Sequence, residues 1–229
     1  HPGGSGFAAL SGAGGDEPVR SLIVGAVALG ILYAISHHNA LLFHLLTELL
    51  AVSVAWAVFL LVWNARETMD HDALLTVGIA YFFIGFLDLI HAAAFQGMGI
   101  LSETWGTDPS IQLWVAARLM EAVTLLSFSI LVGRRVRPGR VLAIYGAVTA
   151  LALLGVFAWD LFPDCHREPG GVTPFKIGAE GLICGILIAA GIGIYRRRRD
   201  LDPTIFGLML AAISLTLVAE LSLVRCGKI

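Results

Sequence analysis

The chain has 229 residues, of which 57% are hydrophobic and only 14% are charged. Soluble domains carry about 25% charged residues, so this composition excludes an ordinary soluble domain and predicts a membrane protein that crosses the bilayer several times. The formal net charge is −2, and the sequence has no basic groove pattern that would indicate nucleic-acid binding.

In chain order, residues 1–19 are rich in glycine and small residues, and we interpret them as a flexible N-terminal tail. Residues 20–229 are predicted to form one transmembrane module, an all-α polytopic bundle. Helices are favoured over a barrel because the apolar runs are long and do not alternate with a period of two. Each break between the runs contains Pro, Gly, Asn or a charge cluster. The seven predicted helices lie near 20–36, 40–63, 73–96, 110–133, 141–162, 174–195 and 204–225.

Positive charges are divided unequally between the two sides that these helices define. One side collects ten, which are Arg20, Arg66, Arg134, Arg135, Arg137, Arg140 and Arg196 to Arg199. The other side collects four, which are Arg167, Lys176, Arg225 and Lys228, and Arg118 lies within a span. The positive-inside rule then predicts a multi-pass protein of the inner (plasma) membrane, with a cytoplasmic N-terminus and residue 229 on the outer side. An odd number of helices leads us to expect an eighth helix that this chain lacks.

Polar residues within the predicted spans share one depth, the outer half of the membrane. Ionisable side chains cost roughly 2.5–3.5 kcal/mol each at a helix centre, so their positions should carry meaning. They lie on five helices, as His44 and Glu48; Asp88 and His91; Trp114, Arg118 and Glu121; Lys176 and Glu180; and Glu220. The common depth predicts one outward-opening polar pocket that binds a ligand. Two plainer interpretations stay open, a structural ion pair of Glu48 or Asp88 with Arg118 and a Lys176 that reaches the headgroups.

The excess of acids in this set indicates a bound cation, a metal ion or protonated carboxyl groups. Imidazole and carboxylate together suit a divalent metal such as Zn, Fe, Mn or Cu. Arg118 instead favours an anionic or carbonyl-bearing small molecule, which its guanidinium could grip through two hydrogen bonds. The candidate metal ligands are His44, Glu48, Asp88, His91 and Glu121.

The cysteines add one further question. Cys165 and Cys226 are both predicted on the outer, oxidising side, where they could form a disulfide, and equally they could be free thiols. Cys184 lies within a predicted helix, and we interpret it as a packing residue.

Four stretches of the sequence, in order, resemble the MASE3 family of membrane-associated sensor domains. They are "FHLLTELLAVSVAWAVFLLVWN", "GIAYFFIGFLDLIHAAAFQGMGI", "QLWVAARLMEAVTLL" and "FPDCHREPGGVTPFKIGAE". The resemblance covers about residues 40–225. The family's pattern maps onto His44, Glu48, Asp88, His91, Trp114, Arg118, Glu121, Thr173, Pro174, Phe175, Lys176 and Glu180. Such domains stand N-terminal to histidine kinases and diguanylate cyclases, so the resemblance implies a sensory role and leaves the stimulus open.

We therefore expect a sensory module that contacts the lipid bilayer, binds a small molecule or metal ion from the outer side, and passes a change in helix packing to a cytoplasmic output domain. Any catalysis would belong to that output domain, and the full-length protein is expected to form a homodimer. One alternative is a membrane-embedded metal-dependent enzyme. A transporter is disfavoured because the second and third spans are apolar across their inner halves and no inverted repeat is evident.

Overall fold

A computed structural model describes residues 17–68, 72–101, 108–167 and 171–226, without the side chains of residues 17–19, 21, 22 and 223–226. These residues form seven helices and one two-stranded hairpin, which confirms the predicted all-α membrane bundle. The helices are α1 (Glu17–His38), α2 (Ala40–Ala65), α3 (Asp72–Ala94), α5 (Asp108–Leu131), α6 (Pro138–Phe157), α7 (Pro174–Arg196) and α8 (Pro203–Cys226). The hairpin strands are β1 (His166–Arg167) and β2 (Gly171–Val172), which pair antiparallel.

Most predicted helix ends lie within three residues of the observed ones, but α6 ends five residues early. The sequence predicts a helix to residue 162, whereas the helix stops at Phe157. There the amides of Trp159 and Leu161 turn back to the carbonyl oxygens of Leu154 and Gly155. At the other end of the chain, α1 begins inside the predicted tail, and residues 1–16 lie outside the described residues.

Six of the described helices are long and apolar enough to cross a membrane, namely α2, α3, α5, α6, α7 and α8. In α1 the described apolar stretch, Ile23–His38, is shorter. Large apolar side chains such as Leu61, Leu151 and Leu215 are more than half exposed, at 71%, 58% and 72%. A continuous apolar exterior of this kind is what a lipid environment covers.

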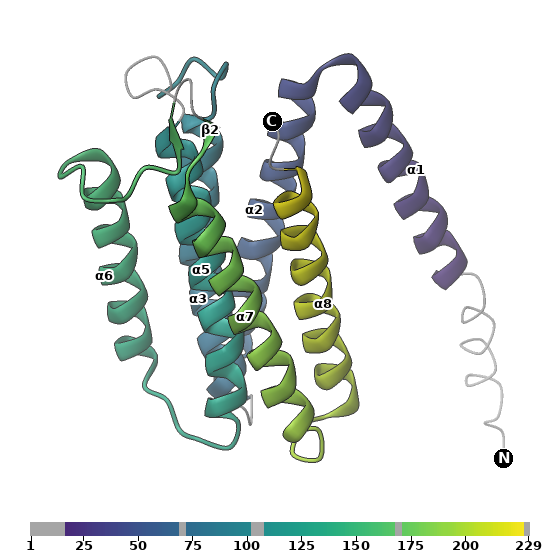
Figure 1. Cartoon of the computed structure of the whole chain (residues 1–229). Coiled ribbons are helices and arrows are strands. Elements are labelled where there is room, and N and C mark those ends of the chain that lie inside the picture. Colours follow the sequence, from purple (N-terminus) through teal and green to yellow (C-terminus); the bar gives the residue numbers. More distant parts are fainter. Residues whose placement is uncertain (1–16, 69–71, 102–107, 168–170, 227–229) are drawn as a thin grey trace, which may run out of the picture. The chain divides into compact units, whose positions relative to one another are not determined.

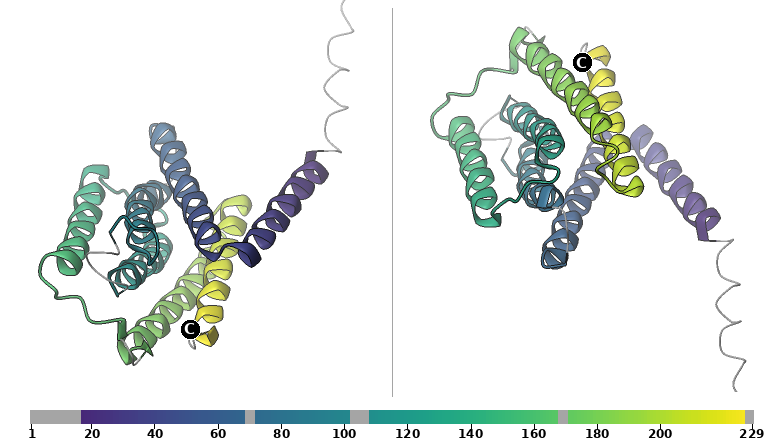
Figure 2. Two further views of the ribbon diagram at one scale, coloured as in Figure 1. Left: turned by 90° about the horizontal axis from the view of Figure 1, so that it is seen from above. Right: turned by 90° about the horizontal axis from the view of Figure 1, so that it is seen from below.

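The chain divides into two units, residues 1–46 and residues 47–229. The first unit holds α1 and the beginning of α2. In the second unit, α3 and α5 are the most buried helices and lie side by side. Helix α6 packs against α3, α7 packs against α5, and α8 packs against α7 (Figures 1 and 2).

Helices α3 and α5 meet the other helices of the second unit through an apolar core. Leu125, Phe128 and Leu187 form one buried cluster, and Leu87 and Leu113 belong to a second one. These side chains are at most 1% exposed. The remaining part of α2 packs on α3, where the indole nitrogen of Trp56 donates a hydrogen bond to the carbonyl oxygen of Phe82 at 3.2 Å.

The second unit has two different ends, because its helices run alternately up and down (Figure 1). The hairpin end holds β1, β2, the start of α7 and the last turns of α3 and α8. The arginine end holds the loop after α5, with Arg134, Arg135 and Arg137, and the run Arg196–Arg199 at the end of α7. Which end faces the cytoplasm stays a prediction.

Candidate functional site

Arg118 of α5 binds two carboxylates, one on the neighbouring helix α3 and one on the next turn of α5. Its Nη2 lies 2.7 Å and 3.0 Å from the two carboxylate oxygens of Asp88 on α3. Its Nη1 lies 2.5 Å from Oε2 of Glu121, one turn further along α5. The other oxygen of Glu121 accepts a hydrogen bond from the hydroxyl of Tyr81 at 3.0 Å. Charge-assisted bonds of this kind are short and strong, so the arginine fixes α3 against α5.

Glu48 of α2 and His91 of α3 face each other beside this arginine. Oε1 of Glu48 lies 3.8 Å from Nε2 of His91. The other ring nitrogen, Nδ1, lies 2.7 Å from the backbone carbonyl oxygen of Ser110. A carbonyl oxygen can only accept, so we assign the proton to Nδ1 and a lone pair to Nε2. Two acceptor atoms therefore face each other, and a proton or cation between them would relieve their repulsion.

Lys176 and Glu180 form a second ion pair, on the first turns of α7. The Lys176 ammonium lies 2.8 Å from Oε1 of Glu180 and 5.6 Å from the centre of the Trp114 ring. The side chains of Lys176 and Glu180 are only 15% and 3% exposed. Thr173 caps this helix by accepting a hydrogen bond from the backbone amide of Lys176. The lysine therefore points inward, rather than toward the headgroups.

Glu220 of α8 is the most deeply buried acid of the set, at 1% exposure. Its carboxylate lies within electrostatic range of Arg118, Glu180, Glu121 and Lys176. Among the described residues, its Oε2 atom has no hydrogen-bond partner. An ionised carboxylate in this position is expensive to bury unless a positive charge joins it.

We call this set the acidic cluster, and it draws on α2, α3, α5, α7 and α8. Its members within the second unit are Glu48, Asp88, His91, Trp114, Arg118, Glu121, Lys176, Glu180 and Glu220. Of the five carboxyl groups, three are paired with Arg118 or Lys176. In the described part of the chain, Glu48 and Glu220 form no ion pair with a lysine or arginine. The cluster thus contains more carboxyl groups than lysine and arginine side chains paired with them.

His44 belongs to the first unit and lies on α2, one turn before Glu48. The candidate metal set therefore divides. Glu48 and His91 face each other, whereas Asp88 and Glu121 are both engaged by Arg118.

Sequence reasoning missed two residues that orient the cluster, Tyr81 and Ser110. Tyr81 lies seven residues before Asp88, which places both on one face of α3, and this spacing was the available signal. Ser110 places its backbone carbonyl oxygen 2.7 Å from His91 Nδ1, and its hydroxyl donates a hydrogen bond to the His91 carbonyl oxygen at 3.2 Å; a lone serine at the start of a predicted helix gave no signal of this role.

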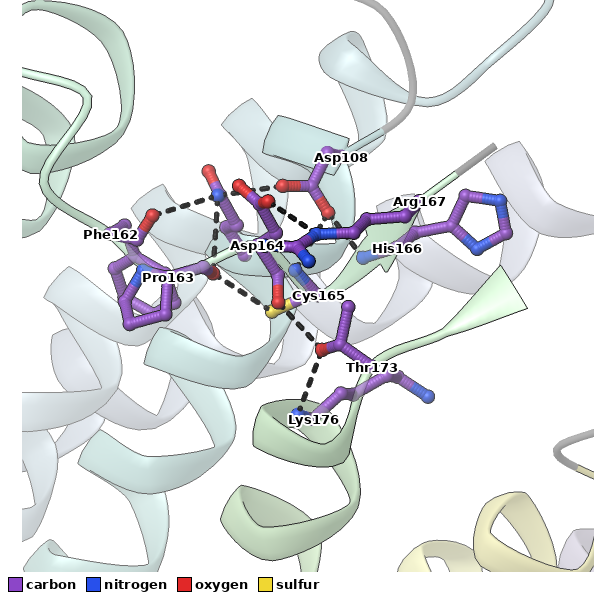
Figure 3. A network of polar contacts seen from close by, with 10 residues as sticks. Asp108, Phe162, Pro163, Asp164, Cys165, His166, Arg167, Thr173 and Lys176 are labelled. Atoms are coloured by element: carbon purple, nitrogen blue, oxygen red, sulfur yellow. Dashed lines mark hydrogen bonds and ion pairs between the residues drawn. The ribbon is translucent and has the colours of Figure 1, made fainter. Parts of the chain in front are cut away.

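The loop between α6 and α7 is fastened over the start of α5 (Figure 3). Oδ1 of Asp108 accepts hydrogen bonds from the backbone amides of Cys165 and His166, at 2.9 Å and 2.6 Å. The Gln112 side chain donates to the backbone carbonyl oxygens of Phe162 and Pro163, at 3.2 Å and 3.3 Å. We call this arrangement the hairpin clasp. It holds the hairpin end of α5, α6 and α7 together.

Within the clasp, Cys165 is a fully buried free thiol. Burial, together with the nearby charge of Asp108, raises the pKa of Cys165 to about 12. The side chain of Cys226 lies outside the described residues, and because Cys165 is a free thiol in the structure, the possible Cys165–Cys226 disulfide is not formed there. Cys184 is a buried free thiol on α7, as a packing residue would be.

Comparison with known proteins identifies the family. A family model described as MASE3, membrane-associated sensor domain, matches residues 35–228, which confirms the resemblance found in the sequence. Neither the curated proteins nor the solved structures gave a match. A sensor domain with six apolar spanning helices is a multi-pass membrane protein in contact with the bilayer. The chain therefore belongs to the MASE3 family of membrane-associated sensor domains.

Proposed function

We propose that this sensor domain detects a cation at the acidic cluster and passes a change in helix packing to an output domain. The observation that carries the proposal is the imbalance of buried charge. Glu220 is 1% exposed with an unpartnered carboxylate oxygen among the described residues, and Glu48 faces a histidine nitrogen that we assign as an acceptor. A cation bound beside either carboxylate would lower the cost of burying its negative charge.

A metal ion is the first candidate, with Glu48 and His91 as ligands. Histidines that bind metals usually donate their second ring N–H to a carbonyl or carboxylate, and the Nδ1 of His91 lies 2.7 Å from the Ser110 carbonyl oxygen. Carboxylate and imidazole donors suit Zn, Fe, Mn or Cu. Asp88 and Glu121 would act indirectly, by holding Arg118 in place beside the ligands.

A small organic cation is the second candidate, and Trp114 supports it. The Trp114 ring faces the Lys176 ammonium at 5.6 Å, and indole faces attract cations. An ammonium ligand could take the place of Lys176 on this ring and pair with Glu180 or Glu220.

Signal transfer would follow from where the ligand's partners lie. Glu48 is on α2 and His91 is on α3, so a metal ion that binds both would draw these two helices together. An organic cation that pairs with Glu220 would act on α8. Conformations in which the helices are closer would then be favoured. The resemblance to MASE3 domains implies that an output domain responds. We place the hairpin end outside and the arginine end in the cytoplasm, on the basis of the positive-inside rule.

The test begins with elemental analysis and native mass spectrometry of the purified full chain in detergent. A metal-binding protein should carry about one ion per chain, and the ion should be lost in Glu48→Gln and in His91→Gln. If the ligand is organic, the spectrum should instead show a small molecule that is lost in Trp114→Ala.

Asp200→Asn is the matched control, because it neutralises an exposed carboxylate that pairs with Arg197 outside the cluster. It should retain the bound species. The proposal fails if the wild type carries no bound species and neither Zn²⁺, Mn²⁺ nor tetramethylammonium raises its unfolding temperature.

A further inference from the structure

A groove with a volume of about 730 Å³ opens at the arginine end of the second unit. It is lined by the turn after α2, the start of α3, the end of α5 with the loop that follows it, and the start of α6. Its rim carries four arginines, which are Arg66, Arg135, Arg137 and Arg140. The groove lies at the end of the unit opposite the hairpin, so it is separate from the hairpin clasp and from Lys176 and Glu180 at the start of α7.

Two acids line the groove, and both are already engaged. Glu67 pairs with Arg66 at 3.1 Å. Asp72 accepts a hydrogen bond from the backbone amide of Val136 at 2.8 Å and lies 3.9 Å from Arg135. They therefore offset only part of the positive charge of the rim.

Arg137 and Arg140 are the arginines available to a ligand. Both are exposed, and within the described ranges neither is paired with a carboxylate. They lie at the start of α6, with Arg140 in its first turn and Arg137 at the cap position without a side-chain hydrogen bond to the helix. The positive end of the helix dipole adds to their attraction for an anion.

The inner wall of the groove is apolar, and it includes Leu75, Val141 and Ile144. Ile144 lies one turn beyond Arg140 on the same face of α6 and is 60% exposed. Going from the end of the bundle into the membrane, this face therefore changes from guanidinium groups to an exposed apolar side chain. A molecule with an anionic head and an apolar tail matches this order.

We propose that the groove binds an anionic phospholipid, with its phosphate between Arg137 and Arg140 and an acyl chain along Ile144. Arginines near a membrane surface attract anionic lipids, and the planar guanidinium group suits a phosphate through two parallel hydrogen bonds. The proposal does not depend on cation binding at the acidic cluster, and either can fail without the other.

The test uses the full chain, purified and reconstituted in nanodiscs. Its readout is the amount of phosphatidylglycerol or phosphatidylcholine that stays bound in native mass spectrometry. The wild type should retain phosphatidylglycerol in preference to phosphatidylcholine. The double variant R137Q/R140Q should retain it more weakly, on the order of tenfold or more, as expected for the loss of two arginines near a charged membrane surface.

The matched control is R198Q/R199Q, which removes two positive charges from exposed residues at the same end of the bundle. It should bind like the wild type, and R137K/R140K should keep most of the binding. If R137Q/R140Q and R198Q/R199Q lose the same amount of bound phosphatidylglycerol, the general surface charge explains the binding and the proposal is overturned. So would equal retention of the two lipids by the wild type, a measurement that depends on no variant. Inorganic phosphate at millimolar concentration should not displace the lipid, and full displacement would point to a free-anion site instead.

Discussion

The guanidinium of Arg118 on α5 lies 2.7 Å from the carboxylate of Asp88 on α3, and this pair links the two most buried helices of the bundle. The same guanidinium holds Glu121, so one cation serves two acids. Removing one member of such a buried network costs more than removing all of it, because the remaining charges are left without a partner.

For that reason Arg118→Met should destabilise the protein strongly, by about 3–5 kcal/mol. Unfolding in mixed detergent micelles, followed by circular dichroism, gives the free energy. The triple variant Arg118→Met, Asp88→Asn, Glu121→Gln should recover much of the loss, since it leaves no unpaired charge. A single variant as stable as the wild type would show that the pair is not structural.

Two acids that face the same interior should respond in opposite ways to neutralisation. In cation-free buffer, Glu220→Gln should raise the free energy of unfolding by about 1–3 kcal/mol, because it removes a buried charge that lacks an ion-pair partner in the described part of the chain. Glu180→Gln should lower it by about 3 kcal/mol, because Lys176 loses the carboxylate at 2.8 Å. The same unfolding measurement checks both. Equal and same-signed effects would contradict the charge distribution described above.

Much of this fold could be predicted from the sequence, since apolar runs of 20 or more residues report the spanning helices directly. That Asp88 and Arg118 lie at the same level of the bundle also followed from their positions along the helices. Their pairing did not, because it depends on how each helix is rotated about its axis. In these helices the lipid-facing and core-facing sides are both apolar, so hydropathy does not reveal the rotation. Residues 158–162 were wrongly predicted to be helical for a related reason. Phe162 packs against the core from a loop, and an apolar loop residue of this kind looks like the continuation of a helix.

The close approach of α2 and α3 depends on the small size of Gly78. A methyl group at Gly78 would lie 2.7 Å from Cβ and Cγ1 of Val62, closer than side chains approach. Gly78→Ala should therefore cost about 1–3 kcal/mol of stability, measured by thermal unfolding. Adding Val62→Ala should restore part of it.

Gly146→Ala is the control for this prediction, because its methyl group would meet the Phe83 ring at an ordinary distance of 3.6 Å. It should change stability little. Alanine has the higher helix propensity at both positions, so a loss of stability at both glycines could not come from propensity. Similar losses would show that the contact with Val62 is not the cause at Gly78.

The raised pKa of Cys165 gives a dependence of stability on alkaline pH. An ordinary thiol has a pKa of about 8.5, whereas burial raises the pKa of Cys165 to about 12. Between these values the unfolded chain loses a proton that the folded chain keeps. The free energy of unfolding should therefore fall as pH rises above about 9, by up to about 1.4 kcal/mol per pH unit for this one group. Cys165→Ala should show a shallower slope, and identical slopes would place the thiol in contact with water.

The assignment of sides can be tested by cysteine labelling in intact cells, with the native cysteines replaced. A cysteine at Leu161, an exposed position in the loop after α6, should react with a membrane-impermeant maleimide from outside. A cysteine at Arg137 should react only after the membrane is opened. Labelling at Arg137 from outside would reverse the assignment.

The hairpin clasp has a mechanical consequence. Asp108 and Gln112 bind the loop between α6 and α7 to the first two turns of α5, so at this end α5, α6 and α7 are linked by hydrogen bonds as well as by packing. Helix α8 packs mainly on α7, and Glu220 near its end forms no ion pair among the described residues. α8 thus has fewer side-chain ties to the rest of the unit than α5, α6 and α7 have to one another. We therefore expect a force on Glu220 to move α8 more readily than the other three helices, with the short turn at Asp200–Pro203 as the hinge.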